Sequence, residues 1–508
     1  MSNKILSAAT IGLDSQLVEV ESDLGGGKGG IFIIVGLPDT AVQESRERVW
    51  SAIKNSDLYF PRKKIVVNLA PADIRKEGPS YDLPIAISLL IRAGLLSLFE
   101  QDKNAIYLGE LSLQGKLRPI TGALSVAILA KEKGIEKIYL PKANAIEASL
   151  VQGLKIIPVD SLISLHSHLT GQKEIPEYKK NDADKFKSEI EFDVDLKHVK
   201  GQEHAKRALE IAASGGHNIL FSGPPGSGKT MLARTVSTIL PKMTQDEILE
   251  VTKIYSVAGK LPKDKPLILE RPFRSPHHTS SGVALVGGGT FPKPGEIGLA
   301  HRGILFLDEF PEFPRIVLEN LRQPLEDGII TVSRAQGTVT FPASFTLIAS
   351  QNPCPCGYYS DPDRECTCSP GQIIKYQKRI SGPLLDRIDL HIEVPRVKFE
   401  KLTSDKFGET SAQVRERVEK AREIQNQRFK NKSFSTNSEM LAKDIRDFCE
   451  VDSQTQDLLK NAVQQLHLSA RSYHRILKIS RTIADLAKEE NIKTPFVAEA
   501  LQYRAKVE

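Results

Sequence analysis

The chain has 508 residues and a formal net charge of +6 at pH 7, with 40% hydrophobic and 26% charged residues. This ordinary composition predicts a soluble protein of about three domains, and so mild a charge permits a polyanionic partner without requiring one. No apolar run approaches the roughly 20 residues of a membrane span, and the N-terminus lacks the apolar core of a signal peptide, so we expect a cytoplasmic protein without membrane contact.

The first 175 residues alternate apolar runs of strand length with segments of helical periodicity. Such alternation predicts one domain of the α/β or α+β class. The segment 82–99 is apolar but contains Arg92, which favours a buried helix. Residues 176–193 are charged and weakly periodic, as is typical of a linker. Strands are expected at 31–35, 64–69, 105–108 and 137–140, and helices at 40–56 and 84–96.

Two segments of this N-terminal domain, RKEGPS at 75–80 and GELSLQGKLRPITG at 109–122, form a recognisable pair. They resemble two motifs of Lon-type proteases, and the resemblance implies a Lon-like (S5-like) α+β fold with Ser80 at the place of the nucleophile. The lysine that activates the serine in that family falls on Leu124 here, and Lys116 does not match its position. Because a serine nucleophile needs an adjacent base, we expect a protease fold without protease activity.

A complete phosphate-loop motif follows the linker: Gly223-Pro224-Pro225-Gly226-Ser227-Gly228-Lys229-Thr230. The apolar run 218–221 precedes it as a strand, and the segment 231–236 follows it as a helix. Glycines let backbone N–H groups close around phosphate oxygens, and the helix N-terminus adds partial positive charge. Lys229 is then expected to reach the β- and γ-phosphates, and the Thr230 hydroxyl to ligate Mg²⁺. The motif predicts ATP and Mg²⁺ as cofactors.

Two further apolar strands end in polar residues. The run 303–307 ends in Asp308 and Glu309, which we expect to hold Mg²⁺ and to polarise the attacking water. The run 345–350 leads to Asn352, which is placed to orient that water or to contact the γ-phosphate. Arg387 follows, between apolar residues and acids, and is either a local ion pair or an arginine finger for a neighbouring subunit's nucleotide.

Two insertions between these strands are candidates for contact with DNA. Residues 271–301 are rich in glycine and proline. In residues 328–341, apolar and polar residues alternate on both sides of a polar tip, a pattern that is typical of a β-hairpin. Basic side chains at such tips bind phosphates without reading sequence, and the alternative is that both segments are solvated loops, since neither is densely basic. The candidate residues are Arg271, Arg274, Lys293 and Arg334.

Four of the five cysteines lie close together in the sequence. They form two C-x-C pairs, Cys354 with Cys356 and Cys366 with Cys368, separated by nine residues. Four thiolates can surround a tetrahedral Zn²⁺, and a cytosolic location disfavours disulfides. The usual spacing is C-x-x-C, so reduced cysteines without a metal remain the alternative to a structural zinc.

The nucleotide motifs together resemble the AAA+ ATPases. The segments 199–209, 271–279, 294–297 and 384–389 are similar to those of the magnesium-chelatase-related branch, and the whole pattern is most similar to the ComM/YifB-type proteins. This resemblance implies a multi-domain α/β protein with a Lon-like domain at 1–175, an AAA+ P-loop αβα module at 194–398 and a helical lid domain at 405–508.

The resemblance also implies a function and further roles. Proteins of this type are described as hexameric, ATP-driven DNA helicases or branch-migration factors in natural transformation and recombination. It implies a ring that acts on single-stranded or branched DNA. Asn352 matches sensor 1, Arg387 the arginine finger and Arg471 the sensor 2 arginine of the lid, with Arg475 one helical turn away as an alternative.

Three other functions fit parts of the sequence. A metal-chelatase motor subunit shares the nucleotide motifs, but the Lon-like domain argues against it. An ATP-dependent protease is disfavoured by Leu124, and a non-hydrolysing DNA scaffold by the intact pair of Asp308 and Glu309. A chelatase-like or protein-remodelling ATPase that does not act on DNA is the principal alternative.

Overall fold

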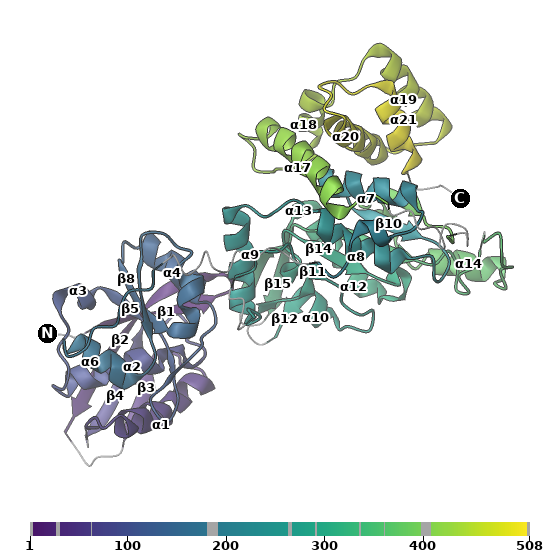
Figure 1. Cartoon of the computed structure of the whole chain (residues 1–508). Coiled ribbons are helices and arrows are strands. Elements are labelled where there is room, and N and C mark those ends of the chain that lie inside the picture. The colour runs from purple at the N-terminus through teal and green to yellow at the C-terminus, as the bar shows by residue number, and fades with distance from the viewer. Residues whose placement is uncertain are drawn as a thin grey trace. The chain divides into compact units, whose positions relative to one another are not determined.

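The chain divides into two compact units in the computed structural model (Figure 1). The N-terminal unit consists of Met1–Glu189 and Thr244–Leu269, and the C-terminal unit of Ile190–Met243 and Glu270–Glu508. The domain boundaries expected from the sequence stay predictions. The structure describes residues 4–26, 31–61, 63–179, 192–262, 267–289, 292–334, 337–359, 361–397 and 408–504.

A seven-stranded mixed sheet forms the centre of the N-terminal unit. Strands β1, β2 and β4 pair antiparallel, and the pairs β3–β4, β1–β5, β5–β8 and β8–β9 are parallel. All four strands expected from the sequence are present. Their order across the sheet is β3 (Phe32–Val35), β4 (Lys64–Ala70), β2 (Asp14–Gly25), β1 (Ile5–Ile11), β5 (Ala105–Tyr107), β8 (Lys137–Pro141) and β9 (Lys155–Val159).

Helices cover this sheet, and the apolar helix α2 is almost entirely buried. In α2, the nine residues from Asp82 to Leu90 are buried, which confirms the expected buried helix. Its one buried charge, Asp82, accepts a hydrogen bond of 2.7 Å from Arg48 Nε and one of 3.0 Å from the Leu111 N–H, so the carboxylate is paired. The helices are α1 (Thr40–Asn55), α2 (Asp82–Arg92), α3 (Glu100–Lys103), α4 (Ala123–Glu132), α5 (Ala145–Ala148) and α6 (Leu162–Leu169), and a hairpin joins β6 (Glu110–Leu111) to β7 (Leu117–Arg118).

One helix of the N-terminal unit comes from a distant part of the sequence. Helix α9 (Gln245–Ala258) begins at a capping box in which Thr244 and Glu247 satisfy each other's backbone N–H groups. It packs against α4, and the Ser256 hydroxyl accepts a hydrogen bond of 3.1 Å from the Gly122 N–H. Lys253 forms an ion pair of 2.9 Å with Asp14. The nucleotide module expected at 194–398 therefore contains a segment whose packing partners are N-terminal residues.

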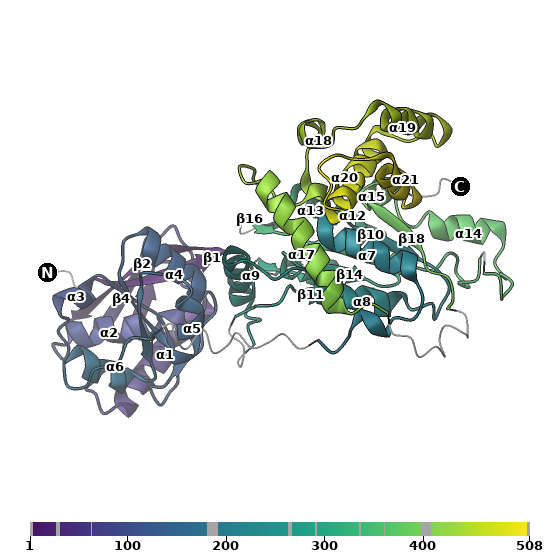
Figure 2. The same ribbon diagram turned by 45° about the horizontal axis from the view of Figure 1, so that its top comes forward.

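A five-stranded parallel sheet forms the centre of the C-terminal unit (Figure 2). The apolar runs that precede the nucleotide motifs form three of its strands, as the sequence predicts. Their side chains are almost all buried because helices pack over the strands, as is usual for parallel sheets. The order is β11 (Phe273–Arg274), β14 (Ile304–Leu307), β17 (Thr346–Gln351), β10 (Ile219–Ser222) and β18 (Leu390–Glu393).

Helices α7 (Glu203–Gly215) and α8 (Lys229–Ile239) contribute buried residues to the core of this sheet. The two insertions expected from the sequence follow, and residues 328–341 form an antiparallel hairpin as predicted. The remaining elements are α10 (Gly282–Val286), β12 (Gly287–Gly288), β13 (Lys293–Pro294), α11 (Glu296–Leu299), α12 (Arg315–Glu319), α13 (Arg322–Asp327), β15 (Ile329–Arg334), β16 (Gly337–Pro342), α14 (Pro370–Gln377) and α15 (Gly382–Leu385).

The C-terminal residues of this unit are helical and share its core. Helix α17 packs against α7 and α8, and α20 packs against α7. Asp485 of α20 has a fully buried side chain, which pairs with Arg428 of α17 at 2.9 Å and with Arg481 at 3.1 Å. The helices are α17 (Ser411–Arg428), α18 (Ala442–Phe448), α19 (Ser453–Gln465), α20 (Ala470–Leu486) and α21 (Thr494–Gln502).

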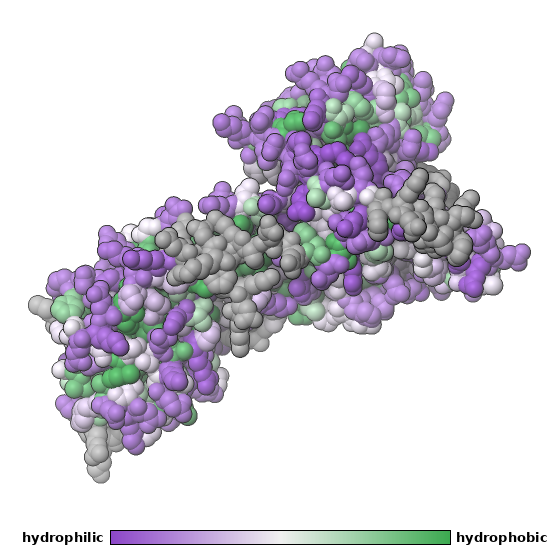
Figure 3. Space-filling view, viewed as in Figure 1, coloured by the Kyte–Doolittle hydropathy of each residue, from purple (hydrophilic) through white to green (hydrophobic). Residues whose placement is uncertain are grey.

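On the face drawn in Figure 3, most of the described residues are hydrophilic, and smaller apolar patches lie among them. Within the described ranges, none of the helices combines the length and the apolar character that crossing a bilayer requires.

Candidate nucleotide site

The phosphate loop joins the carboxyl end of β10 to the first turn of α8. Gly228, the residue before α8, has a φ of +91°, a left-handed conformation that glycine adopts without strain. A Cβ on Gly223 would lie 2.2 Å from the Val394 carbonyl oxygen, so this close approach to the chain after β18 also requires glycine. The loop therefore places the free N–H groups of the first turn of α8 where phosphate oxygens can accept from them.

Lys229 is nearly buried, and its ammonium group turns back to the loop. It donates to the Gly223 carbonyl at 2.7 Å, to the Pro224 carbonyl at 2.9 Å and to Asn352 Oδ1 at 3.3 Å. Burial lowers the pKa of Lys229 to about 8, and the charge of Asp308 acts against this shift. Phosphate oxygens would replace the two carbonyls as partners of the ammonium group.

Asp308, which directly follows β14, accepts hydrogen bonds from three neighbouring residues. Its Oδ2 accepts from the Thr230 hydroxyl at 2.8 Å, and its Oδ1 accepts from the Glu309 N–H at 3.0 Å and from the Ser350 hydroxyl. Hydroxyl and carboxylate oxygens are the donors that Mg²⁺ prefers. The donor set at Thr230 and Asp308 therefore fits the ion expected from the sequence.

Glu309 has a strained backbone and an accessible side chain. Its φ is +53°, which is uncommon for a residue other than glycine and typical of functional sites. Its carboxylate lies 3.1 Å from His278 Nδ1. This contact and the one between Ser350 and Asp308 could not be predicted from the sequence, because each joins residues that are far apart in the chain.

A cavity of about 360 Å³ opens over these groups. The structure thus brings five residues expected to act on ATP to one place, from the ends of three neighbouring strands. The lining residues are Pro225, Gly226, Ser227, Gly228, Lys229, Thr230, Met231, Asp308, Glu309, Ser350, Gln351 and Asn352.

Three family models match consecutive parts of the chain. A model described as magnesium chelatase, subunit ChlI, matches residues 195–402, which contain the parallel sheet and the cavity. A model for subunit ChlI of Mg-chelatase matches residues 20–144, and one for the C-terminal part of that subunit matches residues 408–504.

Relatives match over almost the whole length. The competence protein ComM of Haemophilus influenzae is 47% identical over 99% of this chain and 97% of its own length. The protein YifB of Escherichia coli is 43% identical over 98% of this chain and 96% of its own length. The chain belongs to the ComM/YifB family. The magnesium-chelatase 67 kDa subunit of Heliobacterium mobile is 26% identical over 44% of this chain, which confirms the expected relation of the ComM/YifB family to the chelatase branch.

The arginines assigned to finger and sensor roles both contact one carboxylate in this ComM/YifB family member. Arg387 has a side chain only 8% exposed, and it pairs with Glu326 and donates to the Pro383 carbonyl. Arg471 also reaches Glu326, at 3.4 Å. Arg475 instead donates to the Ile388 carbonyl and to the Ser472 hydroxyl. Glu326 was not expected from the sequence, and its pKa is lowered chiefly by the hydrogen bond from Arg387.

The candidate DNA-binding residues differ in the contacts that they make within the protein. Arg271 donates to the Pro241 carbonyl at 2.7 Å and to the Arg302 carbonyl at 2.8 Å, and Arg274 forms two hydrogen bonds with Glu296. Lys293 is exposed on β13. Arg334 ends β15 at the hairpin tip, and its side chain lies outside the described residues.

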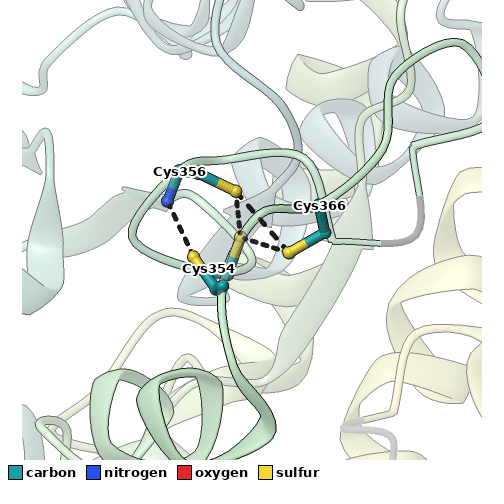
Figure 4. A group of neighbouring side chains, drawn as sticks. Cys354, Cys356 and Cys366 are labelled. Carbon is teal, nitrogen blue, oxygen red and sulfur yellow. Dashed lines mark hydrogen bonds between the residues drawn. The ribbon is translucent and has the colours of Figure 1, made fainter.

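The four clustered cysteines converge in space (Figure 4). Their sulfur atoms all lie within 4.8 Å of one another, an arrangement that could hold a metal ion. The Cys354 sulfur is 3.3 Å from that of Cys356 and 3.7 Å from that of Cys366. A hydrogen bond from the Tyr358 backbone lowers the pKa of Cys356 to about 5. Cys449 is buried away from this group, and burial raises the pKa of its thiol to about 12.

The two segments that resemble motifs of Lon-type proteases, 75–80 and 109–122, both lie within the described residues. Ser80 lies in a 3-10 turn, Pro79–Tyr81, and its carbonyl accepts from the Gly109 N–H at 2.9 Å. Leu124 is fully buried in α4. Lys76 is also buried, and its ammonium group donates to the Pro71 carbonyl.

Proposed function

We propose that this chain is an ATP-driven DNA motor of the helicase or branch-migration type, acting on recombination or natural-transformation intermediates. The observation that supports it most is the convergence of Lys229, Asp308 and Glu309 on one cavity at the ends of neighbouring strands. A second support is the full-length similarity to a protein named a competence protein.

In this proposal, each residue of the cavity has a separate role in ATP hydrolysis. The phosphate-loop N–H groups and Lys229 bind the β- and γ-phosphates of ATP. Thr230 and Asp308 hold Mg²⁺, which when bound neutralises charge on the phosphates. Glu309 takes up a proton from the attacking water, and Asn352 orients that water. The Glu309 carboxylate also contacts His278, whose Nδ1 lies 3.1 Å away.

DNA contact in this proposal involves the two insertions. The tip of the hairpin β15–β16 with Arg334, and the exposed Lys293, would bind backbone phosphates without reading sequence. Arg271 and Arg274 have partners within the protein, so they would contact DNA only after exchanging them. Binding of this kind weakens steeply with salt.

The proposal also gives roles to the arginines, the N-terminal unit and the cysteines. The chain would form a cytoplasmic ring, a hexamer in the family pattern, with Arg387 acting on a neighbour's nucleotide and Arg471 in a helical lid. The N-terminal unit would be a Lon-like domain without protease activity, since Leu124 replaces the base that Ser80 would need. ATP, Mg²⁺ and a structural Zn²⁺ on the four cysteines are its cofactors.

Steady-state ATP hydrolysis tests the proposal. Rates would be measured without DNA and with single-stranded, duplex and four-way-junction DNA, with Glu309→Gln as the hydrolysis-deficient variant and Glu312→Gln as its control. Glu312 pairs with Arg379 at 2.6 Å, away from the cavity lining. Stimulation by single-stranded or branched DNA that is lost only in Glu309→Gln supports a motor. Hydrolysis indifferent to every DNA would refute it and favour chelatase-like or protein-remodelling work.

A further inference from the structure

The loop that bears the four cysteines starts two residues after Asn352 and folds back on itself. We propose that one Zn²⁺ bound by Cys354, Cys356, Cys366 and Cys368 holds this zinc loop against Pro225 and Asn352, and thereby sets the affinity for ATP. Pro225 and Asn352 line the nucleotide pocket, and the zinc loop packs behind them. The second part of this inference rests on the proposed function, because it concerns the same nucleotide site.

The sulfur positions match a tetrahedral thiolate site. Zn–S bonds of about 2.3 Å place the corners of a tetrahedron about 3.8 Å apart. The Cys354 sulfur lies 3.3 and 3.7 Å from those of Cys356 and Cys366, and the last two lie 3.6 Å apart. A disulfide requires about 2.0 Å between two sulfurs, so none of these pairs is bonded.

Backbone N–H groups point to two of the four sulfurs. The Tyr359 N–H points to Cys354 Sγ at 3.3 Å, and the Cys356 N–H points to Cys368 Sγ at 3.4 Å. Such donors stabilise thiolate charge and orient the ligands of a metal. Four protein ligands leave no open position, so the site is structural rather than catalytic.

The zinc loop touches the phosphate loop through one glycine. Gly357 has a φ of +86°, and a Cβ there would lie 2.5 Å from Pro225 Cδ and 3.8 Å from the Asn352 side chain. The turn is closed by the Gly357 N–H, which donates to the Cys354 carbonyl at 3.0 Å. A zinc ion that fixes the two ends of the loop would therefore fix the backbone against Pro225 and Asn352.

Metal content and ATP affinity test the two parts separately in the full-length protein. We expect one zinc per chain by elemental analysis, and a Co²⁺-substituted sample with the absorption of a tetrahedral thiolate site. Cys366→Ser should lose the metal. Protein without metal, or Cys366→Ser with undiminished zinc, would overturn the site.

Gly357→Ala probes the contact without removing a ligand. It should keep its zinc yet bind a fluorescent ATP analogue roughly tenfold more weakly, because a small displacement of positioning groups has large effects. Gly371→Ala is the matched control, since a Cβ there meets nothing within 4 Å. Unchanged affinity in both Gly357→Ala and folded Cys366→Ser would overturn the coupling. Neither measurement includes DNA, so a failure here is distinguishable from a failure of the motor proposal.

Discussion

Glu326→Gln is predicted to raise ATP hydrolysis in the absence of DNA. Glu326 is the carboxylate that holds Arg387, and it also reaches Arg471. In the proposed ring, Arg387 acts as an arginine finger, and while Glu326 holds it within its own subunit it is unavailable to a neighbour's nucleotide. The neutral amide of glutamine keeps the size of the side chain and removes the charge that pairs with Arg387.

The size of the effect follows from burial. The Arg387 side chain is 8% exposed and that of Glu326 is 46% exposed, so the pair is intermediate between a surface pair and a buried one. Surface pairs contribute about 0–1 kcal/mol and broken buried pairs cost about 3–5 kcal/mol, so this contact is worth about 1–2 kcal/mol. That free energy corresponds to a population change of roughly 5- to 30-fold.

The assay is steady-state hydrolysis at saturating ATP, with and without branched DNA. We expect the rate without DNA to rise at least about fivefold in Glu326→Gln, and stimulation by DNA to shrink by a similar factor. Glu319→Gln is the control, because Glu319 pairs with Arg322 at 3.1 Å in the same region. Adding Arg387→Ala should abolish the gain. An unchanged or lower rate in Glu326→Gln would refute the reasoning.

Three further predictions concern stability. Asp485→Asn leaves the buried Arg481 and the partly buried Arg428 without their carboxylate and should lower the free energy of unfolding by about 3 kcal/mol in urea titrations. Burial lowers the pKa of His391 from about 6.5 to about 4, so stability present above pH 6.5 is lost as the pH falls toward 4, by roughly 3 kcal/mol. Thermal melts of His391→Gln should show a flatter dependence over this range, and equal slopes would contradict the assignment. Burial raises the pKa of Glu147, so its ionisation lowers the stability of the folded protein as the pH rises. Glu147→Gln should therefore have a higher melting temperature than the parent protein at pH 8, and the difference should vanish at pH 4. A lower melting temperature of the variant at pH 8 would contradict this prediction.

The nucleotide site could be predicted largely because its residues are local in sequence. Gly223 to Thr230 form one continuous loop, and Asp308 and Asn352 each follow an apolar run that is recognisable as a buried strand. Parallel pairing of these strands brings their ends to one edge of the sheet. The motif strands and the hairpin were therefore predictable from short-range pattern alone.

Contacts across long sequence separations could not be predicted in this way. His278 meets Glu309, and Glu326 meets Arg471, through packing that no periodicity encodes. The same is true of Arg271 and Arg274: basic residues in a glycine-rich segment suggest a free surface, whereas tertiary contacts supply Arg274 with Glu296. In the N-terminal unit, the long antiparallel pair β1–β2 was also not predicted, although four of the seven residues of β1 are buried.

The position of helix α9 affects how truncated forms of this protein should be designed. Since Thr244–Leu269 belongs with the first 189 residues, the polypeptide passes between the units three times. A truncation that starts after residue 193 would keep α9 but remove α4, its packing partner, and would free Lys253 of Asp14. A C-terminal fragment that folds by itself therefore requires a second change, the replacement of residues 244–269 by a short linker. Along the sequence, residues 190–243 of the C-terminal unit interrupt the N-terminal unit, so a single cut releases neither unit whole.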